Sequence, residues 1–86
     1  MVVVKTDTNI YLNVEGFCAN GDDYARPGLY IKPTDYDEYV PVIYCDVGKA
    51  REMLSDIARA ISLYLVSSDV LVLEIRDGKI IHLDGM

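Results

Sequence analysis

The residues that could do chemistry gather in one short segment between two prolines, Pro33 and Pro41. The residues between them, TDYDEYV, include three acids and two tyrosines but no base. Carboxylates supply negative charge, and tyrosine rings supply a large contact area with a polar tip, which is favoured at protein interfaces. The side chains that we expect to bind a partner are Asp35, Tyr36, Asp37, Glu38 and Tyr39, with Asp22, Asp23 and Tyr24 of a neighbouring loop.

Nucleophilic or acid–base catalysis finds little support in the sequence. A reactive thiol needs a base and an electropositive setting. Cys18 lies in the glycine-rich stretch GFCANG, but the only histidine, His82, is far away in sequence and the nearby charges are negative. Catalytic carboxylates need one acid to be selectively desolvated, and the segment 33–41 is typical of a wet loop. We therefore expect no catalytic residue and no enzyme activity.

Metal and cofactor motifs are also missing from the sequence. Zinc sites use cysteine and histidine at paired spacings, and Cys18, Cys45 and His82 show no such spacing. The stretches NGDD and DYDE contain acids but lack the alternating oxygen ligands of a calcium loop. GFCANG matches neither the dinucleotide fingerprint nor the phosphate-binding loop. We expect no metal and no cofactor.

The charge of the chain is strongly one-sided. The net charge of −6 argues against direct binding of nucleic acid and of anionic membranes, since both depend on lysine and arginine. Residues 6–48 contain eight acids but only two bases, Arg26 and Lys32, and carry the entire −6. Lys5 and residues 49–86 together are neutral. This asymmetry favours attraction of a basic partner.

The leading hypothesis is therefore a small, acidic, non-enzymatic binding protein that engages a basic surface of another protein. If that surface normally holds nucleic acid, the acids would mimic phosphate charge and block the site by competition. The size and charge, 86 residues and −6, are typical of small viral inhibitors encoded by phages, including anti-CRISPR proteins, and of antitoxins and immunity proteins.

The alternative hypothesis is a homo-oligomeric accessory domain, most simply a homodimer, without a catalytic role. Its motivation is an excess of apolar residues, because the stretch DVLVLEI needs cover on both faces. Met53, Leu63 and Tyr64 are expected at the rim of the core, where they could complete a two-fold interface. The acidic loops would then only aid solubility.

Alternating apolar residues predict the strands that position these side chains. In the stretch NIYLNVE, Ile10, Leu12 and Val14 are expected to share one buried face of a strand that forms a hairpin with the strand before it. The next stretch, residues 16–28, holds three of the six glycines and a proline, and we expect a loop there. The predicted strands are residues 2–5, 9–15, 29–32, 40–45, 69–76 and 79–83.

One long amphipathic helix is predicted from about residue 47 to residue 66. Asp46 has the short acceptor side chain of an N-cap, and apolar residues recur at the helical period on one broad face. Asp77 and Gly78 predict a type I′ turn between the last two strands. The predicted order is β-β-β-β-α-β-β, an α+β fold with an antiparallel sheet of about six strands and one helix packed on one face.

The length of 86 residues predicts a single domain that spans residues 1–86. The apolar stretch at the start, MVVV, is too short for the apolar region of a signal peptide. No apolar run approaches the ~20 residues of a membrane span. The two cysteines form no Cys-x-x-Cys pattern. We expect a cytoplasmic protein in which both thiols are reduced.

Overall fold

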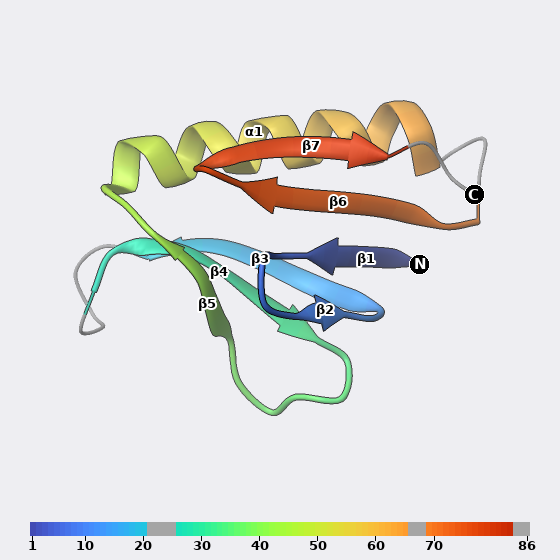
Figure 1. Cartoon of the computed structure of the whole chain (residues 1–86), viewed down its shortest axis with the longest axis horizontal. Helices are drawn as coiled ribbons and strands as arrows, with labels where there is room; N and C mark the ends of the chain where they lie inside the picture. The colour runs from blue at the N-terminus through green and yellow to red at the C-terminus, as the bar shows by residue number, and fades with distance from the viewer. Residues whose placement is uncertain (21–25, 66–68, 84–86) are drawn as a thin grey trace.

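The computed structural model describes residues 1–20, 26–65 and 69–83, and within these residues the protein is an α+β fold of seven strands and one helix. Figure 1 shows how these elements are arranged. The fold class predicted from the sequence is confirmed, and the strand count is close to the expected one. The described elements are β1 (Val2–Lys5), β2 (Ile10–Tyr11), β3 (Val14–Asn20), β4 (Gly28–Pro33), β5 (Val40–Tyr44), α1 (Val47–Tyr64), β6 (Leu71–Arg76) and β7 (Lys79–Leu83).

The described strands form two sheets where the sequence predicted one. One sheet has four strands in the order β2-β1-β6-β7, and the other has three in the order β3-β4-β5. β1 and β6 run parallel, with Val4 opposite Leu73, while the other neighbouring strands of the described chain run antiparallel. The parallel pair places β6 in the interior of its sheet, as its long apolar stretch predicts.

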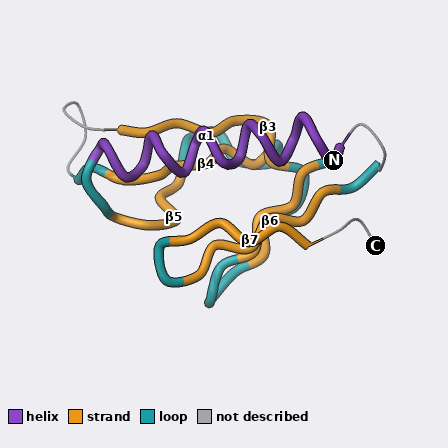
Figure 2. The backbone as a smooth tube through the Cα atoms, turned by 90° about the horizontal axis from the view of Figure 1, so that it is seen from above, coloured by secondary structure: helices purple, strands orange, loops and turns teal. Residues whose placement is uncertain are grey.

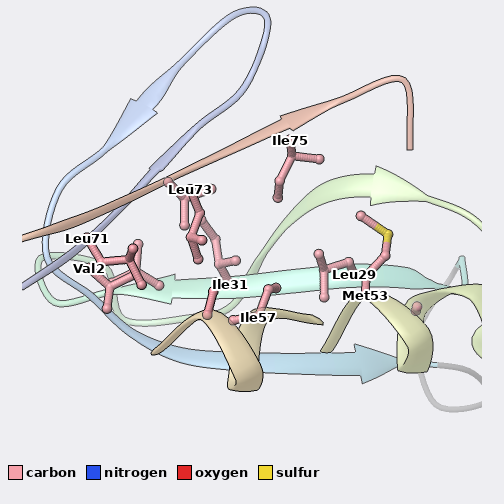
Figure 3. Close-up of a cluster of buried hydrophobic side chains, with 12 residues drawn as sticks. Val2, Leu29, Ile31, Met53, Ile57, Leu71, Leu73 and Ile75 are labelled. Carbon is pink, nitrogen blue, oxygen red and sulfur yellow. The ribbon is translucent and has the colours of Figure 1, made fainter. Parts of the chain in front are cut away.

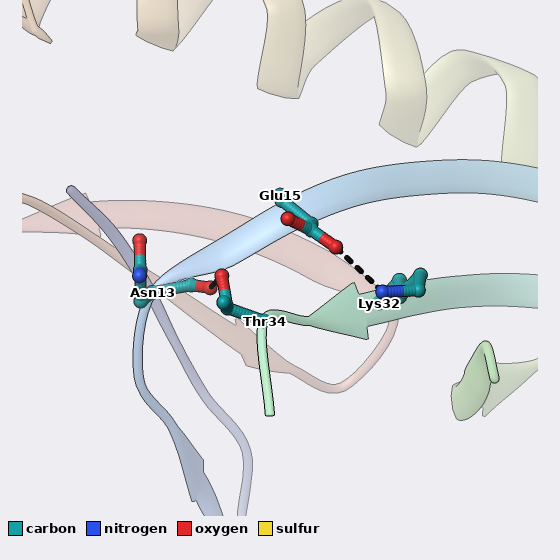
Figure 4. A network of polar contacts seen from close by, with 4 residues as sticks. All are labelled: Asn13, Glu15, Lys32 and Thr34. Carbon is teal, nitrogen blue, oxygen red and sulfur yellow. Dashed lines mark hydrogen bonds and ion pairs between the residues drawn. The ribbon is translucent and has the colours of Figure 1, made fainter. Parts of the chain in front are cut away.

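The predicted strand 9–15 is divided at Asn13 between the two sheets. Asn13 has a φ of 53°, a left-handed backbone conformation that asparagine tolerates better than most residues. Its carbonyl oxygen accepts hydrogen bonds from the backbone nitrogen of Thr34 at 3.0 Å and from the Thr34 hydroxyl at 2.8 Å (Figure 4). Ile10 and Leu12 are each 63% exposed at this corner, so the prediction that they share a buried face is wrong.

Residues 16–20 were predicted to be a loop, and that prediction is wrong. They form the main part of β3 and pair antiparallel with β4, so that Cys18 lies opposite Tyr30. Long-range pairing with β4 overrides the local glycine signal, because a sheet neighbour can stabilise a stretch whose own propensity is low. Residues 21–25 lie outside the described part of the chain.

The helix α1 lies along β3 and β4, with β6 and β7 to one side (Figure 2). It begins after Asp46, whose side-chain oxygen Oδ1 accepts a hydrogen bond from the backbone nitrogen of Lys49 at 2.9 Å, so the predicted N-cap is confirmed. It ends at Tyr64, with Leu65 as its C-cap. Within the described residues, no helix is long and apolar enough to cross a membrane.

The type I′ turn between β6 and β7 is confirmed by the backbone angles of its two central residues. Asp77 has a φ of 53° and Gly78 has a φ of 73°. Both values lie in the left-handed region that this turn requires at its two central positions.

The hydrophobic core lies between α1 and the inner faces of both sheets (Figure 3). Met53 is 2% exposed and belongs to this core, so the prediction that it lies at the rim is wrong. Leu63, by contrast, is 61% exposed. The core cluster comprises Val2, Val4, Val14, Leu29, Ile31, Ala50, Met53, Ile57, Ala60, Leu71, Leu73 and Ile75.

Candidate functional site

The three-stranded sheet presents one face to the core and a second face, here called the outer face, away from α1. Successive side chains of a strand point to opposite sides. Because Leu29 and Ile31 of β4 are buried in the core, Tyr30 between them faces outward. The strand register places Cys18 of β3 opposite Tyr30, and Tyr44 of β5 opposite Gly28, on the same outer face.

A groove of about 480 Å³ lies on the outer face, where the loop after β4 folds back beside the sheet. Gly16 helps to shape this region, since a Cβ atom added there would lie only 2.6 Å from the hydroxyl oxygen of Tyr39. The absence of a side chain at Gly16 therefore lets the Tyr39 ring pack directly on β3. The groove, here called the acidic groove, is lined by Cys18, Asn20, Tyr30, Asp37, Glu38 and Tyr39.

Three of the predicted binding residues meet in the acidic groove. Asp37, Glu38 and Tyr39 contribute to its wall, and all three are exposed. The Tyr39 side chain is 43% exposed, so part of its ring lies against the sheet and part faces solvent. The predicted residues Asp22, Asp23 and Tyr24 lie outside the described residues.

Two other predicted binding residues, Asp35 and Tyr36, lie on the same loop but do not line the acidic groove. Tyr36 is 45% exposed, and its ring meets the ring of Tyr11 edge to face, with centroids 6.0 Å apart and planes at 68°. This contact ties the loop to β2 of the other sheet. Asp35 is exposed and adds charge beside the groove.

Sequence reasoning missed three residues that line the groove: Cys18, Asn20 and Tyr30. The signal that could have found them is the alternation of β3 and β4, which puts one face of each strand toward the loop. The glycines at positions 16, 21 and 28 make residues 16–28 resemble a loop and hide the alternation of β3.

The two bases of residues 6–48 already have partners inside the protein. The Lys32 Nζ atom lies 2.5 Å from Oε1 of Glu15 (Figure 4). The guanidinium carbon of Arg26 lies 4.1 Å from the centre of the Tyr44 ring. In the part of the chain that the structure describes, no ion pair reaches the carboxylates of the acidic groove. Within residues 1–20, 26–65 and 69–83, the negative charge of the groove is therefore not neutralised by an ion pair.

The groove's thiol is poorly suited to nucleophilic chemistry. Burial raises the pKa of Cys18 above its ordinary value of 9.0, so the thiol is protonated at neutral pH. Cys18 and Cys45 are not bonded to each other. Among residues 1–20, 26–65 and 69–83, no cluster of three or more histidine, cysteine or acidic residues is placed to hold a metal ion. The arrangement offers recognition by charge and aromatic surface.

Comparisons of the chain with protein-family models, with curated proteins and with solved structures found no match.

Proposed function

We propose that this protein is a small, non-enzymatic binding protein whose outer face engages a basic surface of another protein. The observation that carries the proposal is the acidic groove, which Asp37 and Glu38 line together with Tyr39, and among the described residues no ion pair reaches these two carboxylates. Carboxylates left exposed in this way attract and orient a positively charged partner. The tyrosine ring adds contact area at a low cost in side-chain entropy.

A basic surface on a protein is often a nucleic-acid site, since lysine and arginine there neutralise phosphates. An acidic protein that covers such a surface acts as an inhibitor by competition. The outer face carries the features required for this role, namely uncompensated carboxylates, aromatic surface and a concave shape. On this proposal, the protein blocks its partner and performs no chemistry.

A capture experiment with a charge-reversed loop tests the proposal. Wild type and an Asp35→Lys/Asp37→Lys/Glu38→Lys variant are immobilised and exposed to extract of the source cell or its host. We expect the wild type to retain a basic protein that the variant loses. Retention should weaken between about 0.1 M and 1 M salt, since the Debye length falls from about 10 Å to about 3 Å. The retained protein is then purified, and its affinity for both forms is measured directly.

The matched control reverses three exposed acids away from the acidic groove. The variant Asp7→Lys/Glu52→Lys/Asp69→Lys has the same net charge as the loop variant and leaves the groove intact. It should retain the partner, because the proposal assigns binding to the groove and not to total charge. Equal recovery by the wild type and the loop variant, or equal losses in both variants, would contradict the proposal.

A second candidate function, a homo-oligomeric accessory domain, is favoured by one exposed apolar side chain on the helix. Leu63 of α1 is 61% exposed. Leu63 lines a hollow of about 200 Å³ that is bordered by Asp56 and Arg59, and opposite charges of this kind can pair across a two-fold axis. Light scattering at several protein concentrations decides this candidate, and a monomer at every concentration would rule it out.

A further inference from the structure

The lining of the acidic groove points to a particular kind of basic group. The charged residues in its lining, Asp37 and Glu38, carry carboxylates that only accept hydrogen bonds when ionised, and the ring of Tyr39 lies beside them in the lining. An anion is repelled by such a site. A cation with several hydrogen-bond donors gains from the carboxylates, and a flat cation also gains from the aromatic ring.

The same face of the sheet already holds a guanidinium group on a tyrosine. The side chain of Arg26 lies over the ring of Tyr44, 4.1 Å from its centre. Tyr44 shares the outer face with Tyr30, and the Tyr30 hydroxyl donates a hydrogen bond of 2.6 Å to the Arg26 carbonyl oxygen. The outer face thus already contains one arginine stacked on a tyrosine, Arg26 on Tyr44, and Tyr30 of the same face lines the groove.

The groove has room for a side chain supplied from outside. Its volume of about 480 Å³ lies within the ~300–1,000 Å³ typical of small-ligand pockets. The described bases nearest in sequence, Arg26 and Lys32, are held by Tyr44 and Glu15 respectively. The groove is therefore open to a cation supplied by another molecule.

We propose that the acidic groove receives the guanidinium group of an arginine presented by the partner protein. This inference rests on the proposed function, and it names the group on the partner that the groove recognises. The guanidinium donates hydrogen bonds to the carboxylates of Asp37 and Glu38 and stacks on the ring of Tyr39. Arginine is favoured over lysine because its planar group stacks on aromatic faces and is more weakly hydrated than an ammonium group.

The test uses the full-length protein, labelled with ¹⁵N, and three short peptides. Acetyl-Gly-Arg-Gly-amide is the probe, the lysine peptide is the competing cation, and the citrulline peptide is a neutral copy of arginine. We expect the arginine peptide to shift the amide signals of Cys18, Asn20, Tyr30 and residues 37–39. Its affinity should be weak, on the order of 1 mM, because one side chain supplies all the contacts. The lysine peptide should bind several-fold more weakly, and the citrulline peptide should cause no shift.

Three variants separate charge from aromatic contact. Asp37→Asn/Glu38→Gln keeps the shape of the groove but removes its charge, and should abolish binding of the arginine peptide. Tyr39→Leu removes the ring and should weaken binding about two- to fivefold. Tyr39→Phe keeps the ring and should bind nearly as the wild type does. Each variant's spectrum away from the groove shows whether it is folded.

The outcomes keep this inference apart from the proposed function. Equal affinities for the arginine and lysine peptides, shifts with the citrulline peptide, or no shifts at all would each overturn the arginine site. If the capture experiment still shows a basic partner that the loop variant loses, the proposed function stands without it. If the capture experiment shows no basic protein that the loop variant loses, while the arginine peptide still binds, the arginine site stands and the proposed function is wrong.

Discussion

At the scale of single residues, an acid that is already paired within the protein is less available to a cation from outside. Glu15 lies on the strand that helps to build the groove, but its carboxylate is paired with Lys32 at 2.5 Å. Asp37 and Glu38 belong to the same acidic half of the chain and have no such pair among the described residues. A count of acids in the sequence therefore overstates the charge that a partner meets, and pairing determines which acids remain available.

The reactivity of the Cys18 thiol reports how far this side chain of the groove is shielded from water. Because burial raises its pKa above the ordinary 9.0, the folded protein holds less thiolate at any given pH than the unfolded chain. We expect iodoacetamide to alkylate Cys18 more slowly in native protein than in urea, with a rate profile whose midpoint lies above pH 9.0. Mass spectrometry of the Cys18 peptide, separated from that of Cys45, measures both rates.

The sign of this effect is fixed by the direction of the pKa shift. With the folded pKa raised, any stability that the thiol proton contributes is present below the unfolded pKa and is lost as the pH rises through the folded pKa. A midpoint below pH 9.0, or faster alkylation of the folded protein, would show an activated thiol and would reopen the case for nucleophilic chemistry.

At the scale of elements, the features that sequence reasoning predicted are those encoded within a few residues. The N-cap at Asp46 and the turn at Asp77–Gly78 each depend on local backbone angles and nearby hydrogen bonds. The long helix was predictable for the same reason, because its apolar face repeats at the helical period. Such signals remain in the sequence whatever the rest of the chain does.

The features that were missed depend on contacts between distant residues. Residues 16–20 are a strand because they pair with β4, and their own glycine suggests the opposite. The division at Asn13 comes from a left-handed backbone whose carbonyl oxygen is bonded to Thr34, the residue that directly follows β4. The loop residues 37–39 of the groove lining were predicted as binding residues. The lining residues of β3 and β4 were not predicted, because they come together only when the two strands pair.

The helix cap provides a prediction at this scale. Asp46→Ala removes the acceptor for the Lys49 amide and should lower the free energy of unfolding by about 1 kcal/mol. Because α1 packs against both sheets, the loss should appear in the global transition, as a fall in Tm of roughly 4–8 °C. Urea and thermal denaturation followed by circular dichroism measure it. Asp46→Asn keeps an acceptor and should stay close to wild type, and an alanine variant as stable as wild type would contradict the role of the cap.

At the scale of the whole molecule, the core face and the proposed binding face lie on opposite sides of β4. The core side of β4 holds Leu29 and Ile31, both 0% exposed, against the helix and the four-stranded sheet. The other side of the same strand carries Tyr30 and the acidic groove. Substitutions on the groove side can therefore change binding while leaving the core contacts intact. This separation is what makes the charge and ring variants interpretable.

The pairing of β1 with β6 joins the two ends of the chain and leads to the last prediction. Val4 and Leu73 face each other across this pair and are both 0% exposed. Opening the pair exposes core side chains that also pack against α1, so we expect the slowest amides of β1 and β6 to exchange only through global unfolding. The amides of β2, a two-residue strand at the sheet edge, should exchange much faster. Hydrogen exchange measured by NMR at several low urea concentrations gives the opening free energy of each amide. These values are compared with the free energy of unfolding from urea denaturation. If β1 opened with a distinctly smaller free energy than β6, the N-terminal strand would be a separable unit, and the packing of both sheets against the helix would not be the source of the protein's cooperativity.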